Sequence, residues 1–405
     1  MQSFKLLLIY FLLTVPFIVA QEKSSYGISF SGFVKSDVFF DTRQNVSIRE
    51  GHFLLYPSPE VLDNNNDDIN AKPSFNILSI QTRLTGKISA PDAFGAKTSG
   101  QIEGEFFGTS DNDINGFRLR HAFVKLDWAN FSLLVGQTWH PMFVTDMFPG
   151  VVSFNTGVPF QPFSRNPQIR LTYSQDNLRV IAGALSQRDF QSDGPSGFSS
   201  NYLRNSVIPN LHLQFQYLMR EVFLGAGFDY KQLTPRLVTA NNLKTDETIK
   251  GVSYIGFLKL NLEPITIKLQ GLYGQNNADL LQIGGYAVQN TDSISSKEIY
   301  TPLNTISTWG EVSIGKEIEY AIFWGYTKSL GSKDDISGAF FGRGKTIDNV
   351  YRLSPRIQFN SERNRISTEV EYTIANYGTP NVKGKVENLK KVSNLRLLVS
   401  FYMFF

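Results

Sequence analysis

Hydrophobic and polar residues alternate through most of the chain, and the pattern is clearest over residues 395–405. Counted back from residue 405, every second side chain is large and apolar: Phe405, Met403, Phe401, Val399, Leu397 and Leu395. The positions between them become polar away from the terminus, as Ser400 and Arg396 show. A period of two is the geometry of a β-strand with one face against an apolar medium. Because a soluble edge strand with such a continuous apolar face would promote aggregation, we predict a strand that faces lipid.

The same alternation, interrupted by turn-forming residues, predicts sixteen strands along the chain. They are expected at 26–41, 75–89, 99–109, 117–128, 131–139, 168–175, 178–187, 209–219, 222–232, 249–262, 265–275, 303–314, 318–329, 349–360, 364–375 and 392–405. An even number of strands returns both ends of the chain to the same side of a membrane. No linker or break in composition divides the chain, so we predict one domain.

The connections between these segments are alternately short and long. Tight turns are expected at 129–130, 175–177, 220–221, 263–264, 315–317 and 361–363. Long connections are expected at 44–74, 139–167, 188–208, 233–248, 276–302, 330–348 and 376–391. The first of these is polar and is expected to be a solvated surface loop. Short turns at one rim and long loops at the other are typical of outer-membrane barrels, in which the turns are periplasmic. We therefore predict an all-β fold, a 16-stranded antiparallel transmembrane β-barrel.

The N-terminal segment and the composition agree with export to the outer membrane. Lys5, an apolar run over 6–19 and the small residue Ala20 predict a signal peptide at 1–20, so that residues 21–405 form the barrel domain. Removal of 1–20 takes away one Lys and no acid, so the formal charge falls from +3 to +2. The absence of Cys excludes disulfides, a lipoprotein anchor and thiolate metal sites. Aromatic residues make up 13% of the chain, yet its mean hydropathy is −0.17, as expected for a barrel with a polar lumen.

Arginines occur on three of the predicted strands at positions that would face the lumen. Arg83 alternates with outward residues such as Ile80 and Leu84, and Arg170 lies between the outward Ile169 and Leu171. The segment 117–128 is ambiguous, because its first half places Arg118 and Arg120 inward whereas its second half, with Ala122, Val124 and Leu126, favours the opposite phase. Two guanidinium groups facing lipid would be costly, so we predict that both arginines face inward. The alternative is a solvated lumen in which these arginines confer no selectivity.

The long connection 139–167, which is the third loop at its rim, has a composition that a solvated loop would not have. It contains five Pro and five Phe, among them Phe143 and Phe154. Proline reduces the entropy that the loop loses on ordering, and so many Phe side chains need an apolar surface to pack against. We predict that this loop folds inward and narrows the lumen opposite the arginines. Asp146 is its only acid and Arg165 is basic, so the balance of charge should favour anions.

The arginine strands and the inward loop resemble those of the trimeric general porins of Gram-negative outer membranes. In that family, a Glu at the position of Glu103 hydrogen-bonds to the arginine cluster. A closer resemblance is to the DcaP-like trimeric porins and rests on three motifs, taken in their order and spacing. They are Gly32-Phe33-Val34-Lys35-Ser36-Asp37 with Asp41, Arg118-Leu119-Arg120-His121-Ala122-Phe123 and Gly136-Gln137-Thr138-Trp139. The resemblance implies a homotrimer and passive uptake of small, often anionic, solutes. The terminal Phe405 resembles the signal that the barrel-assembly machinery reads.

These observations predict a passive diffusion channel for small hydrophilic solutes, with a modest preference for anions and with outer-membrane lipid around it. The alternatives are a phosphate-selective type of porin and a non-conducting structural or secretion-accessory barrel. The histidines show no metal-binding spacing and no Gly-x-Ser-x-Gly motif occurs, so we expect no enzyme. We also expect no cofactor, no bound metal and no nucleic-acid partner.

Overall fold

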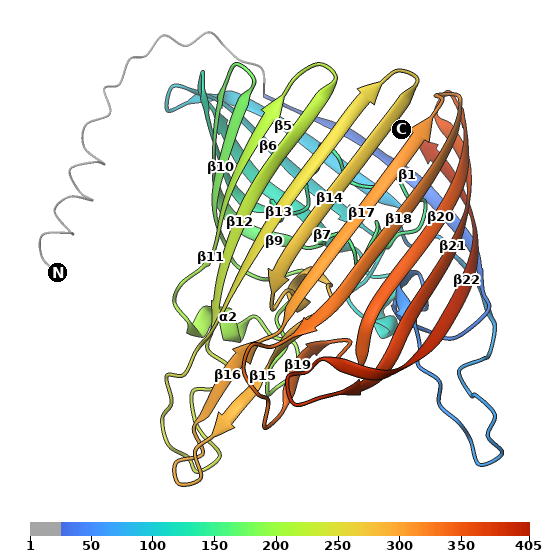
Figure 1. The fold of residues 1–405 in the computed structure, drawn as a ribbon. Helices are drawn as coiled ribbons and strands as arrows, with labels where there is room; N and C mark the ends of the chain where they lie inside the picture. The colour runs from blue at the N-terminus through green and yellow to red at the C-terminus, as the bar shows by residue number, and fades with distance from the viewer. Residues whose placement is uncertain (1–25) are drawn as a thin grey trace, which may run out of the picture.

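Alternating strands close into an antiparallel β-barrel in the computed structural model, which describes residues 26–405 (Figure 1). The predicted signal peptide lies outside the described residues. The wall consists of sixteen strands, one of which is interrupted and carries two labels. Its strands are β1 (Gly27–Asp41), β4 (Ser74–Leu78) with β5 (Arg83–Ala93), β6 (Ala96–Glu105), β7 (Arg118–Asp127), β8 (Phe131–Trp139), β9 (Arg165–Gln175), β10 (Leu178–Leu185), β11 (Asn210–Leu218), β12 (Val222–Leu233), β13 (Ile249–Leu262), β14 (Ile265–Gln275), β17 (Asn304–Ile314), β18 (Ile318–Gly331), β20 (Ile347–Ser361), β21 (Asn364–Pro380) and β22 (Val386–Phe404).

The last strand shows why this sequence forms a barrel wall. Leu397, Phe401 and Met403 are exposed on the outer face of β22, whereas Arg396 and Ser400, which have the opposite phase, are buried on the inner face. Apolar atoms therefore meet the surrounding medium, and polar groups find partners inside, as a membrane barrel requires.

The barrel closes where β1 pairs with β22. The ladder places Phe33 opposite Phe404 and runs to Asp41 opposite Arg396. Gly32 and Phe405 complete it by exchanging two backbone hydrogen bonds of 3.1 Å. The terminal residues thus supply the contact that removes the open edges of the sheet.

The prediction of a 16-stranded antiparallel barrel is confirmed, and most strand boundaries lie close to those predicted. One strand differs, because residues 79–82 leave the ladder between β4 and β5, where the Thr82 N–H donates to the Ser79 carbonyl at 3.3 Å. The prediction that Ile80 faces outward is wrong. Its side chain is only 4% exposed and packs in the apolar core inside the barrel, because the break in the strand removes the alternation there.

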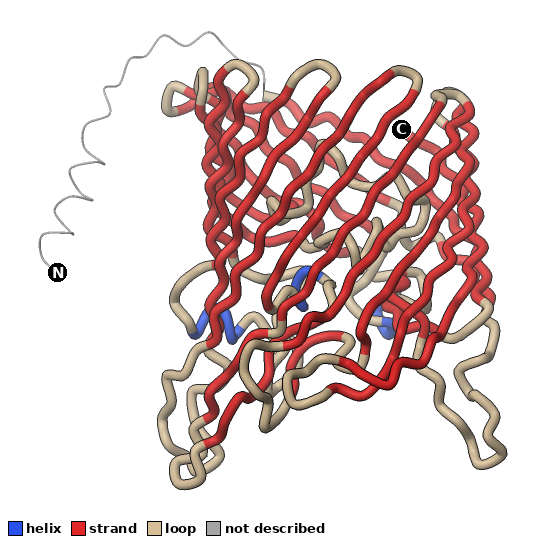
Figure 2. Tube along the Cα trace, in the orientation of Figure 1, coloured by secondary structure: helices blue, strands red, loops and turns tan. Residues whose placement is uncertain are grey.

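Short turns lie at one rim and mostly longer connections at the other (Figure 2). The last connection, predicted at 376–391, is only residues 381–385, because β21 and β22 extend beyond their predicted ends. The first long connection is not a solvated loop throughout, contrary to the prediction. Its β2 (Asn45–Ile48) and β3 (Phe53–Pro57) form a hairpin, and Phe53, Leu55 and Tyr56 are buried in the core. The tip over 61–67 is exposed, as expected.

Small elements in the other long connections were not predicted. They are η1 (Asp111–Asp113), α2 (Asn201–Asn205), η2 (Ala278–Leu280) and a three-stranded sheet of β15 (Gly284–Thr291), β16 (Glu298–Pro302) and β19 (Phe340–Arg343). They are short and lack a long alternating run, so their sequences carry little signal. No helix within residues 26–405 is long and apolar enough to cross a membrane.

Candidate functional site

The two halves of β7 have opposite phases because the strand contains a β-bulge. In the strand ladder, Glu103 on β6 pairs with His121, whereas the next residue of β6, Gly104, pairs with Leu119. Arg120 therefore has no ladder partner on β6. Leu119 before the bulge and Val124 after it are both exposed on the outer face. Arg120 and His121 are adjacent in sequence but both buried inside. An extra residue in one strand shifts the phase by one position, and the bulge therefore accommodates both patterns read from the sequence.

Four arginines and three carboxylates meet on the inner wall beside this bulge, and we call this group the arginine cluster. It consists of Arg83, Glu103, Glu105, Arg118, Arg120, Arg165 and Asp189. Glu105 is fully buried at its centre, 3.0 Å from Arg83 and 2.8 Å from Arg118. Arg120 donates to both Glu105 and Glu103, the latter at 2.7 Å. The arginines exceed the carboxylates by one, so the cluster carries a small net positive charge.

Arg165 joins this cluster from the first residue of β9, rather than lying on the loop opposite it as predicted. Its guanidinium donates to Asp189 through Nε at 2.8 Å and through a terminal nitrogen at 2.6 Å. Asp189 belongs to the connection between β10 and β11 and also accepts from Arg118 at 3.0 Å. Burial raises the pKa of the Asp189 carboxyl, but the Arg165 and Arg118 guanidiniums outweigh this effect and hold that pKa below its usual value.

Arg170 lies apart from the arginine cluster. It donates to the Trp139 carbonyl at 2.5 Å and to Gln168 at 2.9 Å. With Lys125 and Arg179 it lines a separate cavity of about 290 Å³, to which Asp127 and Asp146 also contribute. Of the four arginines expected on the lumen wall, the structure therefore brings Arg83, Arg118 and Arg120 together and places Arg170 elsewhere.

The connection over residues 140–164 folds into the barrel interior, and we call it the inner loop. Figure 2 shows loop segments inside the barrel wall. Its Phe143, Phe154, Phe160 and Phe163 are buried in one apolar core with inward side chains of the wall such as Trp309. The ring of Phe154 stacks on Phe107 at 3.9 Å between centroids. The guanidinium of Arg118 lies 5.1 Å above the same Phe107 ring. The aromatic side chains of the inner loop thus reach the arginine cluster.

Carboxylates on β17 and β21 fix the tip of the inner loop. These contacts are Glu311 to the Gly150 N–H (2.6 Å), Glu369 to the Val152 N–H (2.5 Å) and Glu371 to the Asn155 side-chain amide (2.6 Å). Trp309 on β17 also donates to Gln161 at 2.6 Å. Because β17 lies about halfway round the barrel from β6 in the strand order, the inner loop spans the lumen.

Two cavities lie on either side of the arginine cluster. The first, of about 670 Å³, is lined by long-connection residues such as Arg49 and Arg343 and by Arg118. The second, of about 540 Å³, is lined by Arg83 and Arg120 together with residues near the short turns. The cluster therefore separates a cavity on the long-loop side from one on the turn side. This is the arrangement of a constriction between two vestibules.

Both cavities have more basic than acidic side chains. The long-loop cavity is lined by four basic residues, Arg49, Arg118, Arg188 and Arg343, and by one acid, Asp189. The turn-side cavity is lined by six basic residues, Arg83, Arg120, Lys259, Lys268, Arg356 and Arg365, and by two acids, Glu311 and Glu319. Concave surfaces of one charge sign concentrate ions of the opposite sign. Basic side chains therefore outnumber acidic ones on both sides of the arginine cluster.

Asp146 is the acid of the inner loop, as the sequence showed, and its carboxylate pairs with Arg179 at 2.8 Å. It is about half exposed and lies in the cavity with Arg170, away from the arginine cluster. The acids that do neutralise the cluster include two that sequence reasoning missed, Glu105 and Asp189. Glu105 shares the inward phase of Glu103 on β6, which was a usable signal, whereas Asp189 lies in a long connection without a local pattern.

The sequence and the fold of this chain are similar to those of known outer-membrane proteins. Residues 23–222 match the sequence profile of the family described as DcaP outer membrane protein. The outer membrane channel DcaP of Acinetobacter baumannii has the same fold, with a TM-score of 0.69 and 14% identity over 95% of this chain and 99% of that chain. An anion-selective porin from Comamonas acidovorans (TM-score 0.55, 11% identity, 94% and 100% covered) is also similar. So is the trimer form of OmpT from Vibrio cholerae (0.57, 11%, 94% and 100%). No curated protein matches the chain in sequence.

Proposed function

This DcaP-like chain is an outer-membrane β-barrel of the porin type, and from this premise we propose that it is a passive diffusion channel, not an enzyme, with a modest preference for small anionic solutes. The observation that carries the proposal is the position of the arginine cluster between two cavities that are both rich in basic residues. A solute that passes from one cavity to the other meets Arg118 on one side and Arg83 and Arg120 on the other.

The preference should be modest because carboxylates already bind the arginines. Glu105 contacts Arg83, Arg118 and Arg120, and Glu103 contacts Arg120. At an effective dielectric constant of about 20, a unit charge a few ångströms from a passing ion contributes on the order of a few kcal/mol. Physiological salt screens exposed charges beyond roughly 8 Å. The excess of one arginine, with the basic cavity walls, therefore favours anions without excluding cations.

Single-channel recording tests this proposal directly. The purified protein in a planar bilayer should form discrete conducting steps, and in a KCl gradient its zero-current potential should have the sign of chloride permeation. The basic cavity walls supply the physical reason. Added inorganic phosphate distinguishes a phosphate-selective channel, because phosphate would block such a channel at low concentration. A folded protein that forms no steps would contradict a channel, and a cation-selective potential would contradict the assignment of the arginines.

We further propose that three copies assemble into a trimer. The support is the DcaP-like sequence and the likeness to OmpT from Vibrio cholerae, one structure of which is described as a trimer form. Light scattering, corrected for bound detergent, should give a protein mass of three chains in mild detergent. After boiling, the mass should fall to that of a single chain. Closed symmetry predicts a discrete species instead of a range of sizes. A single-chain mass in several mild detergents would contradict the trimer and leave the barrel assignment intact.

A further inference from the structure

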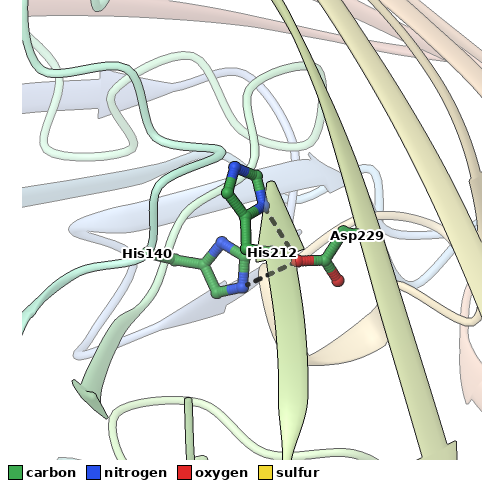
Figure 3. Close-up of side chains that lie close together, drawn as sticks. All are labelled: His140, His212 and Asp229. Atoms are coloured by element: carbon green, nitrogen blue, oxygen red, sulfur yellow. Dashed lines mark hydrogen bonds and ion pairs between the residues drawn. The ribbon is translucent and has the colours of Figure 1, made fainter. Parts of the chain in front are cut away.

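Three buried side chains converge at the base of the inner loop, on the long-loop side of the barrel (Figure 3). His140 follows β8 at the start of the loop, and His212 on β11 lies directly opposite Asp229 on β12 in the strand ladder. The exposed fractions of the three are 0%, 3% and 4%. Sequence spacing could not reveal this group, because more than seventy residues separate His140 from His212 and the three residues come from different elements.

The distances between their polar atoms suit a small metal ion. Nε2 of His140 lies 3.5 Å, and Nδ1 of His212 lies 3.1 Å, from the same oxygen, Oδ2 of Asp229. The three atoms all lie within 4.8 Å of one another. Tetrahedral Zn²⁺ binds nitrogen and carboxylate oxygen at about 2.0–2.2 Å, which separates neighbouring ligands by roughly 3.4 Å. Small side-chain adjustments would therefore bring all three atoms into coordination.

Neighbouring polar groups hold two of the ligands in the orientation that a metal requires. Gln214 Oε1 lies 2.9 Å from Nε2 of His212, and when Nε2 donates its hydrogen bond there, Nδ1, 3.1 Å from Oδ2 of Asp229, is free to bind a metal ion. Asn210 donates to Oδ1 of Asp229 at 2.8 Å and leaves Oδ2 for the group. Such outer partners fix the tautomer and rotation of metal ligands.

His140 supplies a second, independent indication. Its Nε2 is fully buried, points into the group and has no hydrogen-bond partner of normal length. The Met142 N–H approaches Nδ1 of the same ring at 3.2 Å, so this weak contact must open when a metal displaces the Nε2 proton to Nδ1. This cost predicts moderate affinity. Lys231 lies nearby, but Asp279 pairs with its ammonium group, so its charge would not repel a cation strongly.

We propose that His140, His212 and Asp229 form a binding site for one divalent transition-metal ion of the zinc class. Two imidazoles and one carboxylate suit borderline ions such as Zn²⁺, and a fourth position would hold water. The ion would tie the base of the inner loop to β11 and β12. Because the same loop narrows the lumen and is fixed at its tip by β17 and β21, the metal would fasten its second end.

Equilibrium dialysis of the folded, chelator-treated protein against Zn²⁺, with bound metal measured by mass spectrometry, tests this site. The wild-type protein should bind one ion per chain. His212→Ala should weaken binding at least tenfold, and Gln214→Ala, which leaves all ligands in place, should weaken it by about 10- to 100-fold. Co²⁺ in place of Zn²⁺ should give the intense visible absorption of a four-coordinate site in the wild-type protein, and His212→Ala should lose it.

The matched control is His52→Gln, which removes another buried histidine bonded to an aspartate, here Asp37 at 2.6 Å. It should bind Zn²⁺ as the wild-type protein does. The proposal is overturned if the folded wild-type protein retains no more zinc than His212→Ala, or if His52→Gln loses as much as His212→Ala. Should His212→Ala fail to fold, Gln214→Ala decides the matter, and unchanged affinity in that variant overturns the proposal.

Discussion

A channel in which Arg118 and Arg120 are both replaced by Ser should pass more current, and its zero-current potential should move toward cations. The arginine cluster contains four arginines and three carboxylates, so the double change converts an excess of one positive charge into an excess of one negative charge. Two long side chains also leave the boundary between the cavities. Each local charge contributes on the order of a few kcal/mol to a nearby ion, so the sign of selectivity should follow. Bilayer recording in a KCl gradient measures both quantities.

The control removes the same charge from the exposed turns at the other end of the strands. Arg220 and Arg363 are exposed and lie outside both cavities. Replacing both by Ser should leave the conductance and the zero-current potential nearly unchanged. Asp146→Asn should shift the potential the other way, toward anions, because it releases Arg179 from a 2.8 Å ion pair in a neighbouring cavity. If the Arg118 and Arg120 double variant behaves like the turn control, those side chains do not lie on the path of the ions.

The barrel was predictable because one physical demand repeats along every strand. Lipid on one side and polar groups on the other impose a period of two, as Phe401 and Ser400 illustrate at the closing strand. The rule fails where inner residues do not meet water. Trp309 and Phe323 are large, apolar and fully buried inside the wall, where alternation alone predicts polar residues. They face the inner loop, so apolar residues of inward phase were a usable signal for the surface on which that loop packs.

The arginine cluster was only partly predictable, for a different reason. A bulge is a defect of one residue, and the sequence shows it only as a conflict of phase between Leu119 and Val124. Reading that conflict as a choice between two phases gave the arginine positions but not the inward placement of His121 beside Arg120. Contacts made by long connections, such as that of Asp189, depend on the closed barrel bringing distant segments together. No local pattern encodes them.

Replacing Glu105 by Gln should destabilise the folded barrel more than any other single change to the arginine cluster. Glu105 is fully buried and binds Arg83, Arg118 and Arg120, with Arg165 at 3.8 Å. Gln keeps the size of the side chain but removes the charge that the buried Arg120 and the partly buried Arg83 and Arg118 share. Removing one member of a buried ion pair costs about 3–5 kcal/mol because its partner stays buried without compensation. Urea unfolding of the protein in lipid vesicles should show a loss of this order in the free energy of unfolding.

Glu263→Gln provides the comparison that separates burial from charge. Its carboxylate also pairs with a basic residue, Lys316 at 3.4 Å, but both side chains are about four-fifths exposed in a turn between strands. Water solvates the lysine equally well when the partner is lost, so the free energy of unfolding should hardly change. If the Glu105 variant proves as stable as the Glu263 variant, water must reach the guanidiniums that the structure buries. The cluster would then be a hydrated part of the lumen wall, and the arginines would act on passing anions from behind a layer of solvent, with correspondingly weaker selectivity.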